Sequence, residues 1–183
     1  MSNRTNMNNK YNNDKYLTTN NDLETYLSRC ETCYNATQKA TSILYSRDLP
    51  EHKLTKSQSK LAIIVNEPNF NHAIGHWLLV LTEKRKNNQA LIIDPLANTN
   101  EETQGHIYEF CKRNNLSPVF FSIPFQRANS RICGYLTLYM LYCFAHSNMN
   151  AIWRMRGSIS NTPLRFVEKR MMNKVLKHFN VTI

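Results

Sequence analysis

One stretch of the sequence decides how the rest of the chain is interpreted: Gln126-Arg-Ala-Asn-Ser-Arg-Ile-Cys-Gly-Tyr-Leu-Thr-Leu-Tyr-Met-Leu-Tyr-Cys-Phe-Ala145. It begins as a polar, turn-like segment, and from Gly134 to Ala145 it is apolar almost all round. A helix with no polar face is a buried helix, so the sequence predicts a central helix headed by Cys133. At a helix N-terminus the unpaired N–H groups and the dipole favour a thiolate. On its own, however, such a cysteine is more often a small buried apolar side chain.

The segments around this helix predict a single α+β domain with a mixed central β-sheet packed on the helix. Four apolar or β-branched runs predict strands: Leu61–Val65, His76–Thr82, Ala90–Asp94 and Val119–Ile123. The polar segment between the second and third runs predicts a hairpin loop with Lys84, Arg85 and Lys86 at its tip.

Three further segments predict helices outside the sheet. A short helix is expected over Asp22–Leu27 with Asp22 as its N-cap, and another over 101–114. Residues 164–179 place an apolar stripe opposite a basic face, which predicts a surface helix. Residues 1–21 contain eight Asn and no apolar periodicity, so we expect a flexible arm there and the folded domain over 22–183.

Composition excludes several classes of protein. Of the 183 residues, 42% are hydrophobic and 20% charged, which fits neither a disordered chain nor a membrane protein. No apolar run approaches the ~20 residues of a membrane span, and no secretory signal is recognisable. Five cysteines without an export signal indicate free thiols in a reducing compartment. A formal net charge of +10 indicates a polyanionic partner.

Four residues together predict nucleophilic catalysis. A cysteine nucleophile needs a base, which His76 can supply, and the base needs an orienting acceptor. Asp94 ends the strand after that of His76, so hairpin pairing can bring the two side chains together. Gln126 precedes Cys133 by seven residues and can join the Cys133 N–H in an oxyanion hole. Each residue alone has an ordinary structural interpretation, whereas the order His–Asp–Gln–Cys is much less easily accidental.

This order resembles the clan that contains adenain, the adenovirus maturation protease, and the SUMO-specific proteases. The resemblance covers about residues 22–183 and rests on three motifs: Gly75-His76-Trp77, Asp94-Pro95 and Gln126-Arg-Ala-Asn-Ser-Arg-Ile-Cys133-Gly134. The seven-residue step from Gln to Cys is similar to that of adenain. SUMO-specific proteases usually have six residues and an Asp before the Cys, where this chain has Ile132. The resemblance therefore favours the viral branch, which also occurs in virophages and Polinton-type elements.

The resemblance implies a role for each matching residue. Cys133 would be the nucleophile, His76 the general base, Asp94 the orienting carboxylate and Gln126 the oxyanion-hole side chain. Trp77 would be a lid or a cation–π neighbour of the histidine, and Gly134 would allow close approach of backbone or substrate. The resemblance implies capsid precursor proteins as substrates, within the virion and the infected cell. The sequence itself requires no cofactor, although DNA or a viral peptide could serve as activator by resemblance.

Other motifs carry weaker signals. Cys30-Glu-Thr-Cys33 and His72 with His76 have zinc-ligand residue types, but 38 residues separate the pairs, so we predict no metal site. The same CxxC does not follow a strand opening a βαβ unit, which argues against a thioredoxin-like role. With four glycines and no Gly-rich phosphate loop, the chain does not resemble a phosphotransferase.

The basic excess adds a prediction of nucleic-acid binding. Arg165, Lys169, Arg170, Lys174 and Lys177 occupy one half of the last predicted helix. We expect non-specific binding to double-stranded DNA through this face, because no base-reading motif is present. The ordinary alternative is a solvated helix face. The alternative functions are a SUMO- or ubiquitin-like-protein isopeptidase and a non-enzymatic nucleic-acid-packaging protein; we expect a monomer that is neither secreted nor bound to a membrane.

Overall fold

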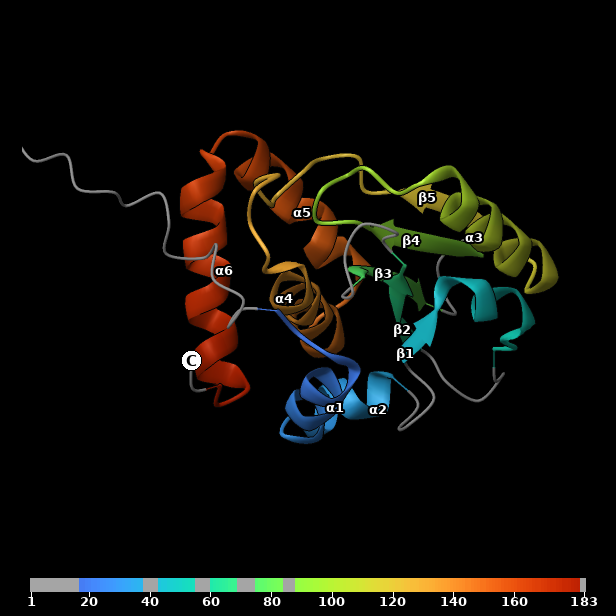
Figure 1. The fold of residues 1–183 in the computed structure, drawn as a ribbon, viewed down its shortest axis with the longest axis horizontal. Helices are drawn as coiled ribbons and strands as arrows, with labels where there is room; N and C mark the ends of the chain where they lie inside the picture. The colour runs from blue at the N-terminus through green and yellow to red at the C-terminus, as the bar shows by residue number, and fades with distance from the viewer. Residues whose placement is uncertain (1–16, 38–42, 55–59, 69–74, 84–87, 182–183) are drawn as a thin grey trace, which may run out of the picture.

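One mixed five-stranded sheet forms the centre of the protein, as seen in a computed structural model that describes residues 17–37, 43–54, 60–68, 75–83 and 88–181 (Figure 1). In spatial order the strands are β1 (Ile43–Tyr45), β2 (Lys60–Glu67), β3 (His76–Glu83), β4 (Gln89–Ile93) and β5 (Ser117–Phe120). The central strands β2, β3 and β4 are antiparallel, whereas each edge strand runs parallel to its neighbour. The predicted α+β class and mixed sheet are confirmed.

Helices cover both faces of this sheet. They are α1 (Asn20–Ser28), α2 (Glu31–Ala36), the 3₁₀ helix η4 (Ser46–Glu51), α3 (Glu101–Arg113), α4 (Cys133–His146), α5 (Met149–Ser160) and α6 (Leu164–His178). Because successive strand residues point to opposite faces, Ile64 and Leu79 pack on the α4 side, while Ile63 and Val80 pack on the α3 side. Burial on both faces explains why the strands read as unbroken apolar runs.

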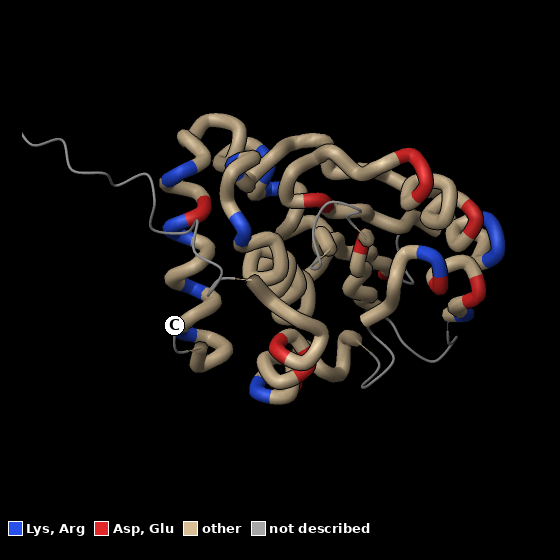
Figure 2. The backbone as a smooth tube through the Cα atoms, viewed as in Figure 1, with Lys and Arg blue, Asp and Glu red and all other residues tan. Residues whose placement is uncertain are grey.

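Helix α4 is the buried central helix that the sequence predicts. Its residues Leu136, Leu138 and Met140 are fully buried, and the helix contacts β3, α2, α5 and α6 (Figure 1). Helix α6 lies against it and has the predicted two faces. The apolar stripe Val167, Met171, Val175 and Phe179 is buried. The five basic residues of α6 are all exposed and follow the helix along its outer side (Figure 2).

Several boundaries differ from those expected. Helix α1 begins at Asn20, and its N-cap is Thr19, which forms a capping box with Asp22, so Asp22 is not the cap. Thr18 is buried at 2% exposure, which places residues 17–21 within the folded part of the chain. The remainder of the expected arm, residues 1–16, lies outside the described residues, as does the predicted loop tip at 84–87. Among the residues that are described, no helix is long and apolar enough to cross a membrane.

Candidate active site

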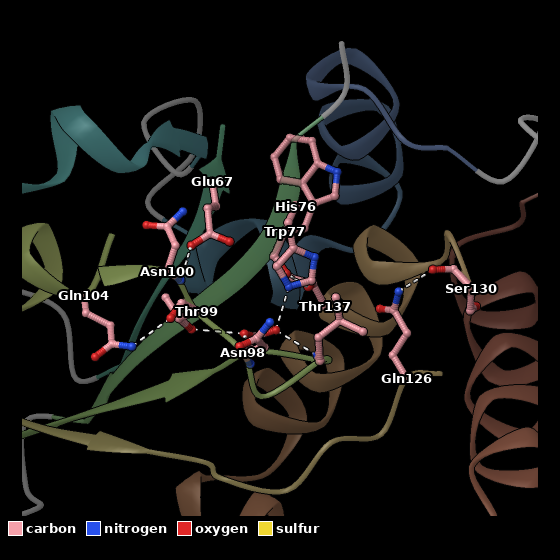
Figure 3. A network of polar contacts seen from close by, with 12 residues as sticks. Glu67, His76, Trp77, Asn98, Thr99, Asn100, Gln104, Gln126, Ser130 and Thr137 are labelled. Carbon is pink, nitrogen blue, oxygen red and sulfur yellow. Dashed lines mark hydrogen bonds and ion pairs between the residues drawn. The ribbon is translucent and has the colours of Figure 1, made fainter. Parts of the chain in front are cut away.

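His76 and Asp94 meet at one end of the β3–β4 hairpin. Leu79 pairs with Ile93, so continuing the register sets Asp94 across from Leu78. His76 is then a diagonal neighbour of Asp94 on the same face of the sheet. The His76 Nε2 atom donates a hydrogen bond of 2.6 Å to Asp94 Oδ1 (Figure 3). The hairpin thus brings together the base and the carboxylate predicted from the sequence.

The carboxylate of Asp94 accepts hydrogen bonds at both oxygens. Oδ1 accepts from His76 and from the Leu96 N–H at 2.8 Å. Oδ2 accepts from the Asn98 N–H at 2.7 Å and from the Thr99 hydroxyl at 3.0 Å. Burial of Asp94 alone would raise its pKa, but the bond from His76 and the backbone N–H groups hold the pKa below its ordinary value. The turn after β4 therefore keeps an ionised carboxylate against the imidazole.

Cys133 is the first residue of α4 and is half-buried. Its thiol is near enough to His76 to contribute to the pKa of the imidazole. Because Nε2 is bonded to Asp94, Nδ1 is the ring nitrogen left for the thiol. Burial of the ring would lower the pKa of His76, but the hydrogen bond to Asp94 and the interactions with Cys133 outweigh it and raise the pKa to about 10. The imidazole is therefore held as a cation beside the thiol at neutral pH.

Gln126 lies on the loop that leads into α4. Its backbone N–H donates to the Pro95 carbonyl at 3.0 Å, which ties this loop to the turn that contains Asp94. The side chain is 3% exposed, and its Nε2 donates to the Ser130 carbonyl at 2.7 Å (Figure 3). The Oε1 atom is buried with no hydrogen-bond partner among the described atoms. An Nε2 group has two N–H bonds, and the bond to Ser130 uses one of them.

A buried ion pair anchors the same loop to α6. Glu168 is fully buried, and its two oxygens accept from the Arg127 N–H and from Arg127 Nε, each at 2.7 Å. The residue next to Gln126 is thus held by both a backbone and a side-chain bond. Glu168 is the one acidic residue of α6, which leaves no acid on the exposed face of that helix.

Trp77 and Gly134 both lie against Thr18, in the segment that precedes α1. Trp77 is 1% exposed and donates its indole N–H to the Thr18 carbonyl at 3.1 Å, so it is a core side chain and not a lid. A Cβ atom at Gly134 would clash with Thr18 Oγ1 and would lie 3.2 Å from Trp77 Cδ1. Close approach does require glycine here, as predicted, but the approaching group is Thr18.

Glu67 is a second buried carboxylate that the sequence analysis missed. It ends β2, pairs across the strands with His76, and accepts from the Asn100 N–H at 2.9 Å (Figure 3). Burial raises its pKa, and the Asn100 N–H and the nearby His76 only partly offset this effect. The one sequence signal was an acid at the end of an otherwise apolar strand, which is also the pattern of an ordinary solvated strand end.

One histidine considered for zinc, His76, is bonded to Asp94, and the other, His72, lies outside the described residues. The Cys30 sulfur instead approaches His146, at the far end of α4 from Cys133. The basic residues of α6 also lie apart from the His76 cluster, on the opposite side of α4 from the sheet (Figure 2).

Comparison with known proteins gives a limited result. No family model and no curated protein sequence matches the chain. Among solved structures, the crystal structure of the ASFV pS273R protease in its selenomethionine form is similar to this chain. The TM-score is 0.35 and the identity 11%, with 68% of this chain and 45% of that chain covered. This chain thus spans less than half the length of that protease. Any assignment of function therefore depends on the arrangement of His76, Asp94, Gln126 and Cys133.

Proposed function

We propose that the protein is a cysteine endopeptidase with Cys133 as nucleophile. The observation that carries this proposal is the His76 ring, which is bonded to the buried Asp94 carboxylate and whose pKa is raised by Asp94 and by the neighbouring Cys133 thiol. A base that is both oriented and adjacent to the first residue of a buried helix is the arrangement that thiol catalysis requires. An ordinary buried cysteine needs neither partner.

In the proposed mechanism the Cys133 thiolate attacks the carbonyl carbon of a peptide bond. The oxyanion is stabilised by the Cys133 N–H and the second side-chain N–H of Gln126. The His76 cation then protonates the departing amine, leaving a thioester on Cys133. Water, deprotonated by His76, hydrolyses the thioester and regenerates the thiol and a free carboxylate. Asp94 orients His76 throughout.

The resemblance to the adenain family extends this proposal to substrates and place of action. We propose that the substrates are capsid precursor proteins, cut during virion maturation in the infected cell. The seven-residue step from Gln126 to Cys133, with Ile132 before the nucleophile, supports this choice over a SUMO-type isopeptidase. Incubating the protein separately with a capsid precursor and with a SUMO-conjugated protein distinguishes the two; cleavage of the conjugate alone would favour the isopeptidase.

Substituting the nucleophile tests the enzymatic proposal directly. Cys133→Ala should abolish cleavage of a co-expressed precursor, whereas Cys111→Ala, a buried thiol on α3, should leave it intact. Iodoacetamide at neutral pH should alkylate Cys133 first, because an activated nucleophile reacts before structural thiols. Full cleavage by Cys133→Ala, or a Cys133 that resists alkylation while other thiols react, would refute the proposal. A packaging protein without enzymatic activity would lose nothing in Cys133→Ala.

A second candidate function, non-specific DNA binding, is favoured by α6. Its five exposed basic side chains face solvent without an acid among them, because Glu168 is buried against Arg127. Such a surface binds phosphates, with a slope of log affinity against log salt of about −3 to −5 for four to five contacts. Substituting Arg165, Lys169, Arg170 and Lys174 with Gln should flatten this slope. Lys53→Gln with Lys112→Gln, exposed on the α3 side, is the matched control. No binding by wild-type protein at low salt would mean a merely solvated face.

A further inference from the structure

In the folded chain the CxxC motif, Cys30 and Cys33, lies beside His146, a residue that no sequence spacing connects with it. Cys30 is the N-cap of α2 and Cys33 lies within that helix, while His146 is the last residue of α4. Cys30 Sγ lies 3.7 Å from His146 Nε2, and the ligand atoms of all three residues lie within 4.8 Å of one another. These three residues, called here the Cys30 cluster, lie far from the His76 centre.

The distances between the ligand atoms of the Cys30 cluster are close to those of a tetrahedral metal site. With Zn–S at about 2.3 Å and Zn–N at about 2.05 Å, a tetrahedral angle separates sulfur from nitrogen by about 3.6 Å and two sulfurs by about 3.8 Å. The observed separation of 3.7 Å between Cys30 and His146 already has this value. The longest separation in the cluster, at most 4.8 Å, needs a contraction of about 1 Å, within the reach of a cysteine rotamer.

Neighbouring groups hold the cluster in this arrangement. The Cys33 backbone N–H donates to Cys30 Sγ at 3.4 Å, a contact that stabilises negative charge on the sulfur. The ring of Tyr142 packs tilted against His146 with centroids 4.2 Å apart, and it stacks on His178 at 4.1 Å. The imidazole is therefore oriented by an aromatic neighbour while its Nε2 faces the sulfurs. All five cysteines are free thiols, so neither sulfur is committed to a disulfide.

The three residues form a two-sulfur, one-nitrogen ligand set. Cys30 and Cys33 belong to the C-x₂-C at α2, and His146 ends α4. Cys143, three residues before His146, lies outside this set. Thiolate sulfur and imidazole nitrogen are ligands that Zn²⁺ prefers, and a set of three protein ligands leaves the fourth tetrahedral position to water.

We propose that Cys30, Cys33 and His146 bind one Zn²⁺ ion. The two thiols each lose a proton on binding, so the site takes up Zn²⁺ and releases two H⁺. A water molecule would complete the tetrahedron. Cys133 and His146 are thirteen residues apart on α4, which corresponds to about 20 Å along the helix. The ion would fasten α2, too short to be stable alone, to the far end of the helix that carries the nucleophile.

Metal binding to the full-length chain tests this proposal without any assay of activity. Reduced, chelator-treated protein should bind one equivalent of Zn²⁺ in competition with a chromogenic chelator. Co²⁺ in its place should give the visible bands of a tetrahedral ion and a thiolate-to-metal charge-transfer band. Cys30→Ser with Cys33→Ser should lose both signals. Cys133→Ser, which removes the thiol of the other Cys–His pair, should keep them.

The outcomes separate this proposal from its alternatives. Absence of the tetrahedral spectrum in wild-type protein would refute the site. Its loss in Cys133→Ser but not in Cys30→Ser would assign the metal to the His76 centre instead. A Cys30–Cys33 disulfide in protein that binds no Co²⁺ after reduction would identify a redox pair. Cys143→Ser, which removes a thiol three residues before His146, should keep the charge-transfer band; loss of part of the band would overturn the three-residue ligand set.

Discussion

Replacing Asp94 with Asn tests the proposed centre most directly, because the carboxylate has a defined hydrogen-bond donor at every contact. Oδ1 faces His76 and the Leu96 N–H, and Oδ2 faces the Asn98 N–H and the Thr99 hydroxyl. An amide has a single oxygen. Whichever way the Asn side chain is turned, its NH₂ group therefore meets a backbone N–H, that of Leu96 or that of Asn98.

The magnitude of the effect follows from this arrangement. One buried N–H loses its acceptor, which costs about 1–3 kcal/mol. Loss of the negative charge also weakens the bond to His76, for a further ~1.5–3 kcal/mol. We expect the free energy of unfolding to fall by about 3–5 kcal/mol, a decrease in Tm of roughly 10 °C for a domain of this size. An amide that donates to Nε2 also forces the proton onto Nδ1, facing Cys133, so kcat should fall on the order of 10³–10⁴-fold.

Peptide cleavage and urea unfolding measure the two effects separately. Asp48→Asn is the matched control, since Asp48 is exposed and lies 3.9 Å from Arg47, and it should change neither quantity. The alkaline limit of activity should also move to lower pH in Asp94→Asn, because Asp94 helps to raise the pKa of His76. Cleavage within about tenfold of wild type in a folded Asp94→Asn would refute the reasoning. Glu67, the other buried acid near His76, would then be the residue to substitute.

Three other changes give further predictions. Gly134→Ala should destabilise the fold by about 1–3 kcal/mol in urea unfolding, since its Cβ meets Thr18 Oγ1, and adding Thr18→Gly should recover part of the loss. Glu168→Ala leaves the buried side of Arg127 unpaired and should cost about 3–5 kcal/mol; a loss below about 1 kcal/mol would show that the pair contributes little. The raised pKa of His76 stabilises the folded state fully below pH about 6.5, and this stabilisation is lost as pH rises through about 10. The difference in unfolding free energy between wild type and His76→Gln should therefore shrink over that range, and a difference independent of pH would contradict the shift.

The sequence predicts those parts of the fold whose signal is local and periodic. The unbroken apolar runs of β2, β3 and β4 and the one-sided stripe of α6 mark their own positions. β5 was expected at Val119–Ile123 but is Ser117–Phe120, because Pro118 argues against a strand unless that strand is at the edge of a sheet. β1 and α2 were missed because three and six residues are too few to display a period.

For the candidate site, residue type and chain order were enough to select His76, Asp94, Gln126 and Cys133, but not their surroundings. Thr18 and Glu67 are buried beside the centre only because the strands and α4 bring distant segments together. The partner of Cys30 illustrates the same limit. His146 is 116 residues further along the chain, and no spacing rule connects a motif before the sheet to the end of a helix after it.

The residues of the candidate site are far apart in the sequence, and their positions determine when the site can form during synthesis. His76 and Asp94 are 18 residues apart and can meet as soon as one hairpin forms. Cys133, the proposed nucleophile, is made 57 residues after His76, and the bonds that Glu168 on α6 forms with Arg127, next to Gln126, come later still. A nascent chain on the ribosome, which folds from its N-terminal end, therefore holds an incomplete centre until nearly all of the described fold has emerged. With the proposed activity, newly made copies would in this way be kept from cutting one another, or the proteins made beside them, before they are fully folded.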